Sequence, residues 1–236
     1  MYCKKLEDKL TNFDGIESVI QSKPGCLISF VNPFSYPIIS KDLDLINNID
    51  YWFSDGFILC KLITFFDKRK LNRYSFDFSS IAHEVFKYIE KENLNLAIIG
   101  ANKNEIENAI DYIKSIYDIN VGYFSDGYFD LENNAHDQNL IDNNIDVLIV
   151  GMGTPYQEKF MIDINKKVNL VFSISCGGFL TQTALKGDYY HPIVKKLGLR
   201  WLQRAIMHQH VRERLIKDYP YFLLKYIYTR TFNKNY

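Results

Sequence analysis

The sequence predicts an α/β fold: a Rossmann-like, mainly parallel sheet with helices on both faces, plus a basic helical appendage at the C-terminus. Short apolar runs alternate with longer amphipathic stretches, which is the order of strands and helices in repeated βαβ units. The runs at 97–100, 147–151 and 171–176 are almost continuously apolar, as in strands covered on both faces. The appendage is indicated by a change of composition after Pro192.

Six strands are expected, at residues 26–32, 49–54, 94–100, 120–124, 145–151 and 169–176. Between them, the apolar side chains of 79–91 and 104–117 recur at helical spacing. Asn102 or Asn104 suits the N-cap of the second helix, and Pro155 suits the first turn of a helix through Lys167. Residues 133–144 are polar with weak periodicity, which is typical of a short helix or a loop.

The tail has its own pattern. Residues 195–207 predict a helix, and 210–217 continue it or begin another. Pro220 is expected to interrupt the helix before a very aromatic segment at 221–232. A boundary near 187–192 therefore divides the chain into an α/β domain at 1–190 and a helical appendage at 191–236.

The net charge of zero hides an asymmetry between these two parts. Residues 1–190 contain 18 Lys and Arg against 26 Asp and Glu, whereas residues 191–236 contain 10 against 2. A basic tail is attracted to phosphate in nucleic acid, in lipid headgroups or in a diphosphate substrate. Its cations alternate with aromatic residues, which suits a membrane interface. A solvated helix packed on the domain, or RNA binding, remains an alternative.

No cysteine or histidine pattern points to a metal or a disulfide. Cys3, Cys26, Cys60 and Cys176 are scattered without a CxxC pair, which predicts reduced thiols in a cytosolic protein. The first residues lack the apolar stretch of a signal peptide. No run approaches the roughly 18 apolar residues that span a bilayer. These observations predict a cytoplasmic protein that is able to lie on a membrane.

Candidate ligand-binding residues stand at the ends of the predicted strands. The run Gly151-Met152-Gly153 precedes a helix, whose N-terminus offers free N–H groups to phosphate. Gln157 and Glu158, in the first turn of that helix, face the same crevice or lie on a solvated surface. The alternative for the glycines is a tight turn without a ligand.

The second strand ends at Asp55, whose carboxylate is a candidate general base. An Asp-Gly turn or a helix N-cap explains it almost as well. Asn32 closes the first strand, and Gly177-Gly178 close the last. Arg73 and Asp77 bracket a segment that leads into a helix. Polar residues and glycines at so many strand ends favour one common site, because ligands bind at the carboxyl ends of open α/β sheets.

These landmarks resemble the WecG/TagA/CpsF glycosyltransferases. GMGTPYQEKF, at residues 151–160, is similar to the family stretch G-x-G-x-P-x-Q-E, and LRWLQR, at 199–204, is similar to its L-x-W-x-x-R helix. The resemblance covers roughly residues 26–220. The other landmarks occur in family order, and they are Asn32, Asp55-Gly56, Arg73 with Asp77, Gly100, Gly127-Tyr128-Phe129 and Gly177-Gly178.

The resemblance implies an inverting, metal-independent transfer from a UDP-sugar (N-acetylmannosamine-like or another hexose) to a polyprenyl-diphosphate-linked acceptor. It implies cell-surface polysaccharide synthesis at the inner face of the cell membrane, on an anionic surface, with no cofactor and no nucleic acid. It assigns the catalytic base to Asp55, and it leaves a dimer or trimer open. The substrate-binding residues it implies are Asn32, Arg73, Asp77, Gly100, Tyr128, Phe129, Gly151, Gly153, Gln157, Glu158, Gly177, Gly178, Arg204, Arg212 and Arg214.

The chain departs from the family pattern at several places. Phe30 stands where the family often has Thr, Ser75 where it usually has Gly, and Ile58 where a second Gly follows the Asp-Gly pair. These departures leave the donor sugar open. Two other classes also stay open: a Rossmann-like nucleotide-binding oxidoreductase or regulator, and a non-catalytic membrane-surface or RNA-binding protein. The absence of a GxGxxG run counts against the former.

Overall fold

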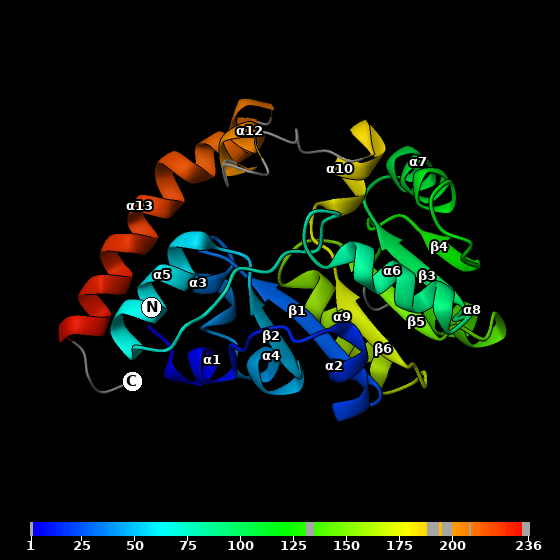
Figure 1. The fold of residues 1–236 in the computed structure, drawn as a ribbon, viewed down its shortest axis with the longest axis horizontal. Helices are drawn as coiled ribbons and strands as arrows, with labels where there is room; N and C mark the ends of the chain where they lie inside the picture. The colour runs from blue at the N-terminus through cyan, green and yellow to red at the C-terminus, as the bar shows by residue number, and fades with distance from the viewer. Residues whose placement is uncertain (1, 131–134, 188–193, 195–199, 208, 233–236) are drawn as a thin grey trace.

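Six parallel strands form the centre of the fold (Figure 1), in a computed structural model that describes residues 2–130, 135–187, 194, 200–207 and 209–232. Their order across the sheet is β2-β1-β6-β5-β3-β4. All six predicted strands are confirmed, most of them one to three residues shorter than expected. They are β1 (Cys26–Val31), β2 (Tyr51–Ser54), β3 (Leu96–Gly100), β4 (Val121–Ser125), β5 (Val147–Gly151) and β6 (Phe172–Ser175).

Helices cover both faces of the sheet, as predicted. Buried side chains of α1 (Lys4–Lys9), α3 (Tyr36–Ile39), α4 (Leu43–Asn48), α5 (Phe57–Asp67), α8 (Ala135–Asp142) and α9 (Tyr156–Asn165) pack on one face. Those of α2 (Ile16–Ser22), α6 (Ala82–Lys91), α7 (Lys103–Lys114) and α10 (Phe179–Lys186) pack on the other. The all-parallel sheet between two helical layers is the Rossmann-like arrangement that the alternating runs predict.

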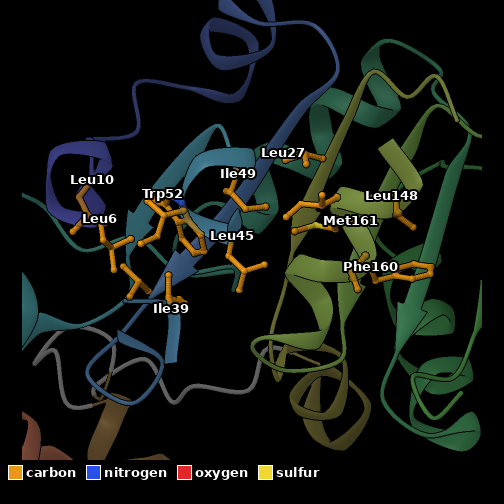
Figure 2. Close-up of a cluster of buried hydrophobic side chains, with 14 of the residues drawn as sticks. Leu6, Leu10, Leu27, Ile39, Leu45, Ile49, Trp52, Leu148, Phe160 and Met161 are labelled. Carbon is orange, nitrogen blue, oxygen red and sulfur yellow. The ribbon is translucent and has the colours of Figure 1, made fainter. Parts of the chain in front are cut away.

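Alternation along each strand divides the core into two clusters. Leu27 and Val31 of β1 enter one cluster, while Cys26 and Ile28 enter the other. Figure 2 shows part of the first cluster, in which the fully buried Trp52 lies among side chains of α1, α3 and α4. Because both faces of the sheet are buried, the strand ends are where polar groups become accessible.

Sequence signals located the long helices better than the short ones. Asn102 caps α7 through a capping box with Glu105, and the weakly periodic 133–144 contains the helix α8. Asp42 caps α4 by accepting a hydrogen bond from the Leu45 N–H. Helices α1, α2 and α3 have seven residues or fewer, too few turns to show a period.

The expected helix break at Pro220 is wrong. Pro220 lies inside α13 (Gln209–Phe232), which follows α12 (Arg200–Met207). A proline within a helix removes one hydrogen bond. Here the residues that follow it are held by the core, since Phe222 and Tyr226 are fully buried and pack on the Tyr36 ring with centroids 5.4 and 5.8 Å away. Tertiary packing therefore outweighs the local preference.

A polar cluster fixes α13 to the start of the chain. Tyr36 Oη donates to Glu7 Oε1 at 2.6 Å, and Arg230 Nη1 lies 3.8 Å from Glu7 Oε2. Arg230 also pairs with Asp67 of α5 and lies over the Tyr2 ring. Burial raises the pKa of the Glu7 carboxyl. The division of the chain near residues 187–192 remains a proposal. With that division, α13 of the second part and the start of the first part belong to one core.

Among the described residues, no helix is both long enough and apolar enough to cross a membrane.

Candidate active site

A cavity of about 480 Å³ lies at the carboxyl edge of the sheet. Residues at the ends of all six strands line it: Asn32 after β1, Asp55 after β2, Ala101 after β3, Gly127 and Tyr128 after β4, Gly151 at the end of β5, and Ser175 to Gly178 from β6 onward. The strand-end residues of the sequence therefore do converge, as the rule for open α/β sheets predicts.

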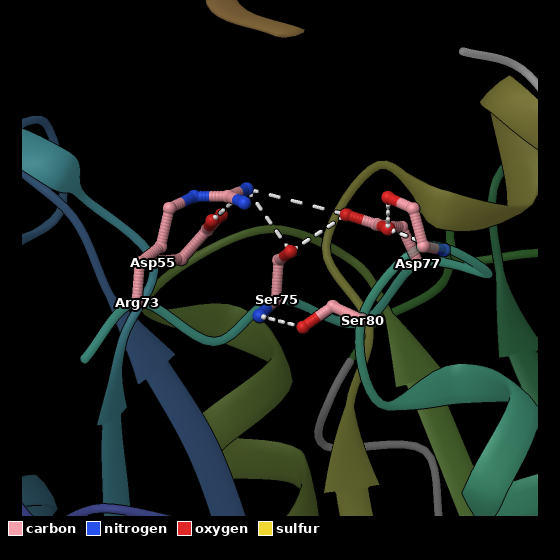
Figure 3. Close-up of polar contacts among 6 residues, drawn as sticks. Asp55, Arg73, Ser75, Asp77 and Ser80 are labelled. Carbon is pink, nitrogen blue, oxygen red and sulfur yellow. Dashed lines mark hydrogen bonds and ion pairs between the residues drawn. The ribbon is translucent and has the colours of Figure 1, made fainter. Parts of the chain in front are cut away.

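Asp55 and Arg73 form an ion pair in this cavity (Figure 3). Arg73 Nη2 lies 2.7 Å from Asp55 Oδ1 and also donates to Ser75 Oγ at 3.0 Å. Both charged side chains are about one-fifth to one-quarter exposed. Partial exposure leaves the Asp55 carboxylate accessible to a ligand.

Asp77 belongs to the same cluster but is more enclosed. Its Oδ2 accepts from Ser75 Oγ at 2.6 Å and lies 4.0 Å from Arg73 Nη2, while its Oδ1 accepts from the Ser79 N–H. These bonds fix the turn that leads to α6. Arg73 Nη2 therefore lies near two carboxylates, that of Asp55 at 2.7 Å and that of Asp77 at 4.0 Å.

Asn32 turns the chain at the end of β1. Its side-chain oxygen accepts from the N–H groups of Phe34 and Ser35, at 2.9 and 3.0 Å, and so caps the turn into α3. Asn32 lines the cavity at the same time. The sequence signal for a strand-end Asn therefore marks both a turn residue and a part of the site.

Two helix N-termini open on the cavity. Gly153 and Thr154 precede α9, and Gly177 and Gly178 precede α10. Gly153 and Gly177 have φ values of 78° and 51°, which residues with a Cβ rarely adopt. The free N–H groups and dipoles of two helices produce a region that favours an anion.

Gly100 lies beneath the lining. A Cβ on it would come within 2.5 Å of the Gly151 carbonyl oxygen, so these neighbouring strands require glycine there to approach each other at their ends. Its role is to shape the cavity floor from below.

Gln157 lines the cavity and is 4 % exposed, whereas Glu158 is completely buried and does not line it. The expectation that both face the crevice holds for Gln157. Glu158 turns inward to the strands instead, and Oε1 of its carboxyl accepts from Ser29 Oγ at 2.7 Å. Burial raises the pKa of this carboxyl.

Tyr128 and Phe129 point to different environments. Tyr128 lines the cavity and is 81 % exposed, at its rim. Phe129 packs on His136 and Phe160, with ring centroids 3.9 and 5.5 Å away, and is not part of the lining. Phe129 thus anchors the loop that presents Tyr128.

The structure does not bring the tail arginine Arg212 to the cavity. Its Nη1 donates to the carbonyl oxygens of Ala205 and Ile206, each at 3.2 Å, and so joins the end of α12 to α13. Arg204 lies in α12 and Arg214 in α13, but their side chains fall outside the described part of the chain.

Several cavity residues were not among the predicted site residues. Thr154 and Ser175 line the cavity, and Ser29 lies directly below it. Phe30 and Ser75, which the sequence marked as departures from the family pattern, line it too. The available signal was a small polar residue within an otherwise apolar strand, as at Ser29 and Ser175. Among the described residues, no group of three or more His, Cys, Asp or Glu is arranged to hold a metal ion.

A parallel sheet with a carboxylate–arginine pair and two helix N-termini at one edge favours an anionic ligand, and charged pairs in such a cavity are common in enzymes. The family model described as the glycosyl transferase WecG/TagA/CpsF family matches residues 8–236. The chain belongs to this family and is a glycosyltransferase. The family assignment excludes the two alternatives left open by the sequence, a nucleotide-binding oxidoreductase or regulator and a non-catalytic protein.

Three relatives are similar over most of the chain. A UDP-Gal:alpha-D-GlcNAc-diphosphoundecaprenol beta-1,4-galactosyltransferase of Shigella boydii is 40 % identical over 203 residues, 85 % of each chain. An N-acetylglucosaminyldiphosphoundecaprenol N-acetyl-beta-D-mannosaminyltransferase of Bacillus subtilis is 27 % identical over 92 % of this chain and 86 % of its own. An enzyme of the same name from Staphylococcus aureus is 26 % identical over 78 % and 71 %.

Proposed function

We propose that this chain transfers galactose, or a closely similar hexose, from a UDP-sugar to an N-acetylglucosaminyl-diphosphoundecaprenol acceptor with inversion of configuration. The observation that carries the proposal is the Asp55–Arg73 pair in a cavity lined from all six strand ends. The galactosyltransferase relative is considerably more similar to this chain than the two mannosaminyltransferases are, which favours galactose over N-acetylmannosamine.

Asp55 is the proposed general base. It takes the proton of the acceptor hydroxyl while the hydroxyl oxygen bonds to C1 of the sugar. The bond from C1 to the diphosphate oxygen breaks, and UDP leaves from the opposite side. One carboxylate is sufficient for this single displacement, and the β-linked product named for the Shigella boydii relative is consistent with inversion of an α-linked donor.

Positive potential for the leaving diphosphate comes from the chain itself. The N-termini of α9 and α10 and the guanidinium of Arg73 line the cavity, where the diphosphate charge increases as the bond breaks. We propose that they act without a metal ion, with Arg204 and Arg214 as further candidates from the tail. Asn32, Gln157 and Tyr128 then contact the uridine or the sugars.

UDP is expected to raise the melting temperature of the purified chain, because a ligand that binds only the folded state stabilises it by mass action. At about 100 times its Kd the stabilisation is about 2.7 kcal/mol. Differential scanning fluorimetry with UDP, UDP-galactose and NADH, each with and without EDTA, measures it. A shift that EDTA removes contradicts metal independence, and a shift with NADH but not UDP contradicts the nucleotide assignment.

A second surface fits the lipid-linked acceptor. Helix α5 begins two residues after Asp55, and its Phe57 and Phe65 are 64 % and 77 % exposed. Together with Leu223 of α13 they line an apolar groove, and Lys61 lies over the Phe57 ring at 5.3 Å. Exposed aromatic rings beside cations are typical of membrane interfaces. We propose that this surface contacts the inner face of the cell membrane.

Replacing both Phe57 and Phe65 with serine is expected to weaken binding to anionic vesicles by tenfold or more, because two apolar side chains no longer enter the interface. Cosedimentation with phosphatidylglycerol vesicles measures the binding. Phe124→Ser is the matched control, since Phe124 is also an exposed phenylalanine but lies in β4, at the other edge of the sheet. Equal binding by the double variant and the control contradicts the proposed surface.

A further inference from the structure

Five polar side chains converge under the floor of the cavity. Glu158 Oε1 accepts three hydrogen bonds: from Ser29 Oγ at 2.7 Å, from Gln157 Nε2 at 2.8 Å and from Thr154 Oγ1 at 3.1 Å. The Ser29 hydroxyl also lies 2.8 Å from Ser175 Oγ. A single carboxyl oxygen therefore joins the start of α9 to β1, and through Ser29 to β6.

This carboxyl determines which atom of the Gln157 amide is left for a ligand. Gln157 Nε2 is directed at Glu158, so the amide has one defined orientation. Its Oε1 is buried and accepts no hydrogen bond from any residue that the structure describes. Gln157 lines the cavity with 4 % exposure, so a group bound there is the available partner. A buried polar atom without a partner in the protein requires an explanation, and a bound ligand is one.

Gln157 Oε1 is a hydrogen-bond acceptor, so its partner must be a donor. The diphosphate oxygens of a UDP-sugar are themselves acceptors and cannot donate a hydrogen bond to Gln157 Oε1. A sugar or ribose hydroxyl or the uracil N–H can, because each of them donates.

We infer that Glu158 is a positioning residue that fixes the Gln157 amide so that its carbonyl oxygen accepts a hydrogen bond from a hydroxyl or N–H group of the bound UDP-sugar. This inference rests on the proposed function and deepens it. It also accounts for an adjacent Gln-Glu pair in which only the first side chain lines the cavity.

The two carboxyl oxygens of Glu158 differ in their hydrogen-bond partners, and this difference allows a specific test. All three donors reach Oε1, while Oε2 has no partner among the described residues. Burial also raises the pKa of this carboxyl, which favours its neutral form. Glutamine at position 158 keeps an acceptor at Oε1, whereas methionine has a similar length and removes it. Glu158→Gln should therefore preserve the Gln157 orientation that Glu158→Met loses.

The experiment measures UDP-galactose affinity by isothermal titration calorimetry, and inhibition of transfer by inorganic pyrophosphate. Glu158→Met is expected to weaken UDP-galactose binding about tenfold, the effect of one lost hydrogen bond. Glu158→Gln is expected to restore affinity to within about threefold of the unmodified chain. Pyrophosphate has no sugar, ribose or uracil group to donate to Gln157 Oε1, so its inhibition constant should not change in either variant. Met161→Leu, a buried change one turn further along α9, is the control.

Unchanged UDP-galactose affinity in Glu158→Met overturns the inference, and so does an equal loss for UDP-galactose and pyrophosphate, which indicates general damage to the site. If Glu158→Met does not fold, Gln157→Met removes the carbonyl itself and must show the same selective loss. Failure of the unmodified chain to bind any uridine nucleotide is a different result, because it contradicts the proposed function rather than the role of Glu158.

Discussion

Replacing Asp55 with asparagine is expected to lower kcat by about 10²- to 10⁴-fold, the usual contribution of a general base. Asparagine has nearly the same shape but cannot take the proton of the acceptor hydroxyl. UDP affinity should change by only a few-fold, because the helix N-termini and Arg73 remain. Steady-state transfer kinetics and calorimetric titration with UDP measure the two effects separately.

The Asp55–Arg73 ion pair complicates the interpretation, since Asp55→Asn also removes a charge beside Arg73. Asp77→Asn is the matched control, because Asp77 faces the same guanidinium at 4.0 Å. If Asp55 only positions Arg73, both variants should lose activity and UDP affinity together. A loss of kcat confined to Asp55→Asn supports the base, and full activity of Asp55→Asn excludes it.

Replacing Phe222 with alanine is expected to lower the free energy of unfolding by about 3–5 kcal/mol, the typical cost of removing a buried aromatic side chain. Phe222 is fully buried and packs on Tyr36 and Tyr226, with both ring centroids 5.4 Å away. Position 222 is near the C-terminal end of the chain, yet the side chains that Phe222→Ala would leave without a packing partner belong to the core. Urea denaturation measures the change.

Tyr221→Ala is the control for Phe222→Ala. Tyr221 is the adjacent residue of α13 and is 57 % exposed, so its loss should change stability by no more than about 0.5 kcal/mol. Equal stability of the two variants would contradict the packing of α13. The expected result also means that a chain shortened near residue 190 loses part of its core, so the tail cannot be studied by simple removal.

The sequence was sufficient to predict the sheet and the edge at which the site lies. Apolar runs marked each strand, and Asn32, Asp55, Gly151 and Gly177 marked the strand ends, because a chain leaving a buried strand shows an abrupt change of residue type. The capping box at Asn102 was also predictable, since it depends on residues three apart.

The remaining features depend on contacts that the local sequence does not record. Whether Gln157 or Glu158 turns to the cavity is decided by the polar side chains Ser29 and Ser175 on distant strands. Arg73 reaches Asp55 through tertiary folding, since the two residues are 18 positions apart in the sequence. From the local sequence, Pro220 predicts a helix break. The burial of Phe222 and Tyr226, which holds the helix together after Pro220, depends on tertiary contacts.

The most direct test is a transfer assay with the unmodified chain, radiolabelled UDP-galactose and N-acetylglucosaminyl-diphosphoundecaprenol in vesicles, with EDTA present. We predict a galactosylated lipid product with a β-linkage, and faster turnover with UDP-galactose than with UDP-N-acetylmannosamine. Product that forms only with UDP-N-acetylmannosamine, or only when a divalent cation is restored, would contradict the proposed donor or the proposed metal-independent chemistry.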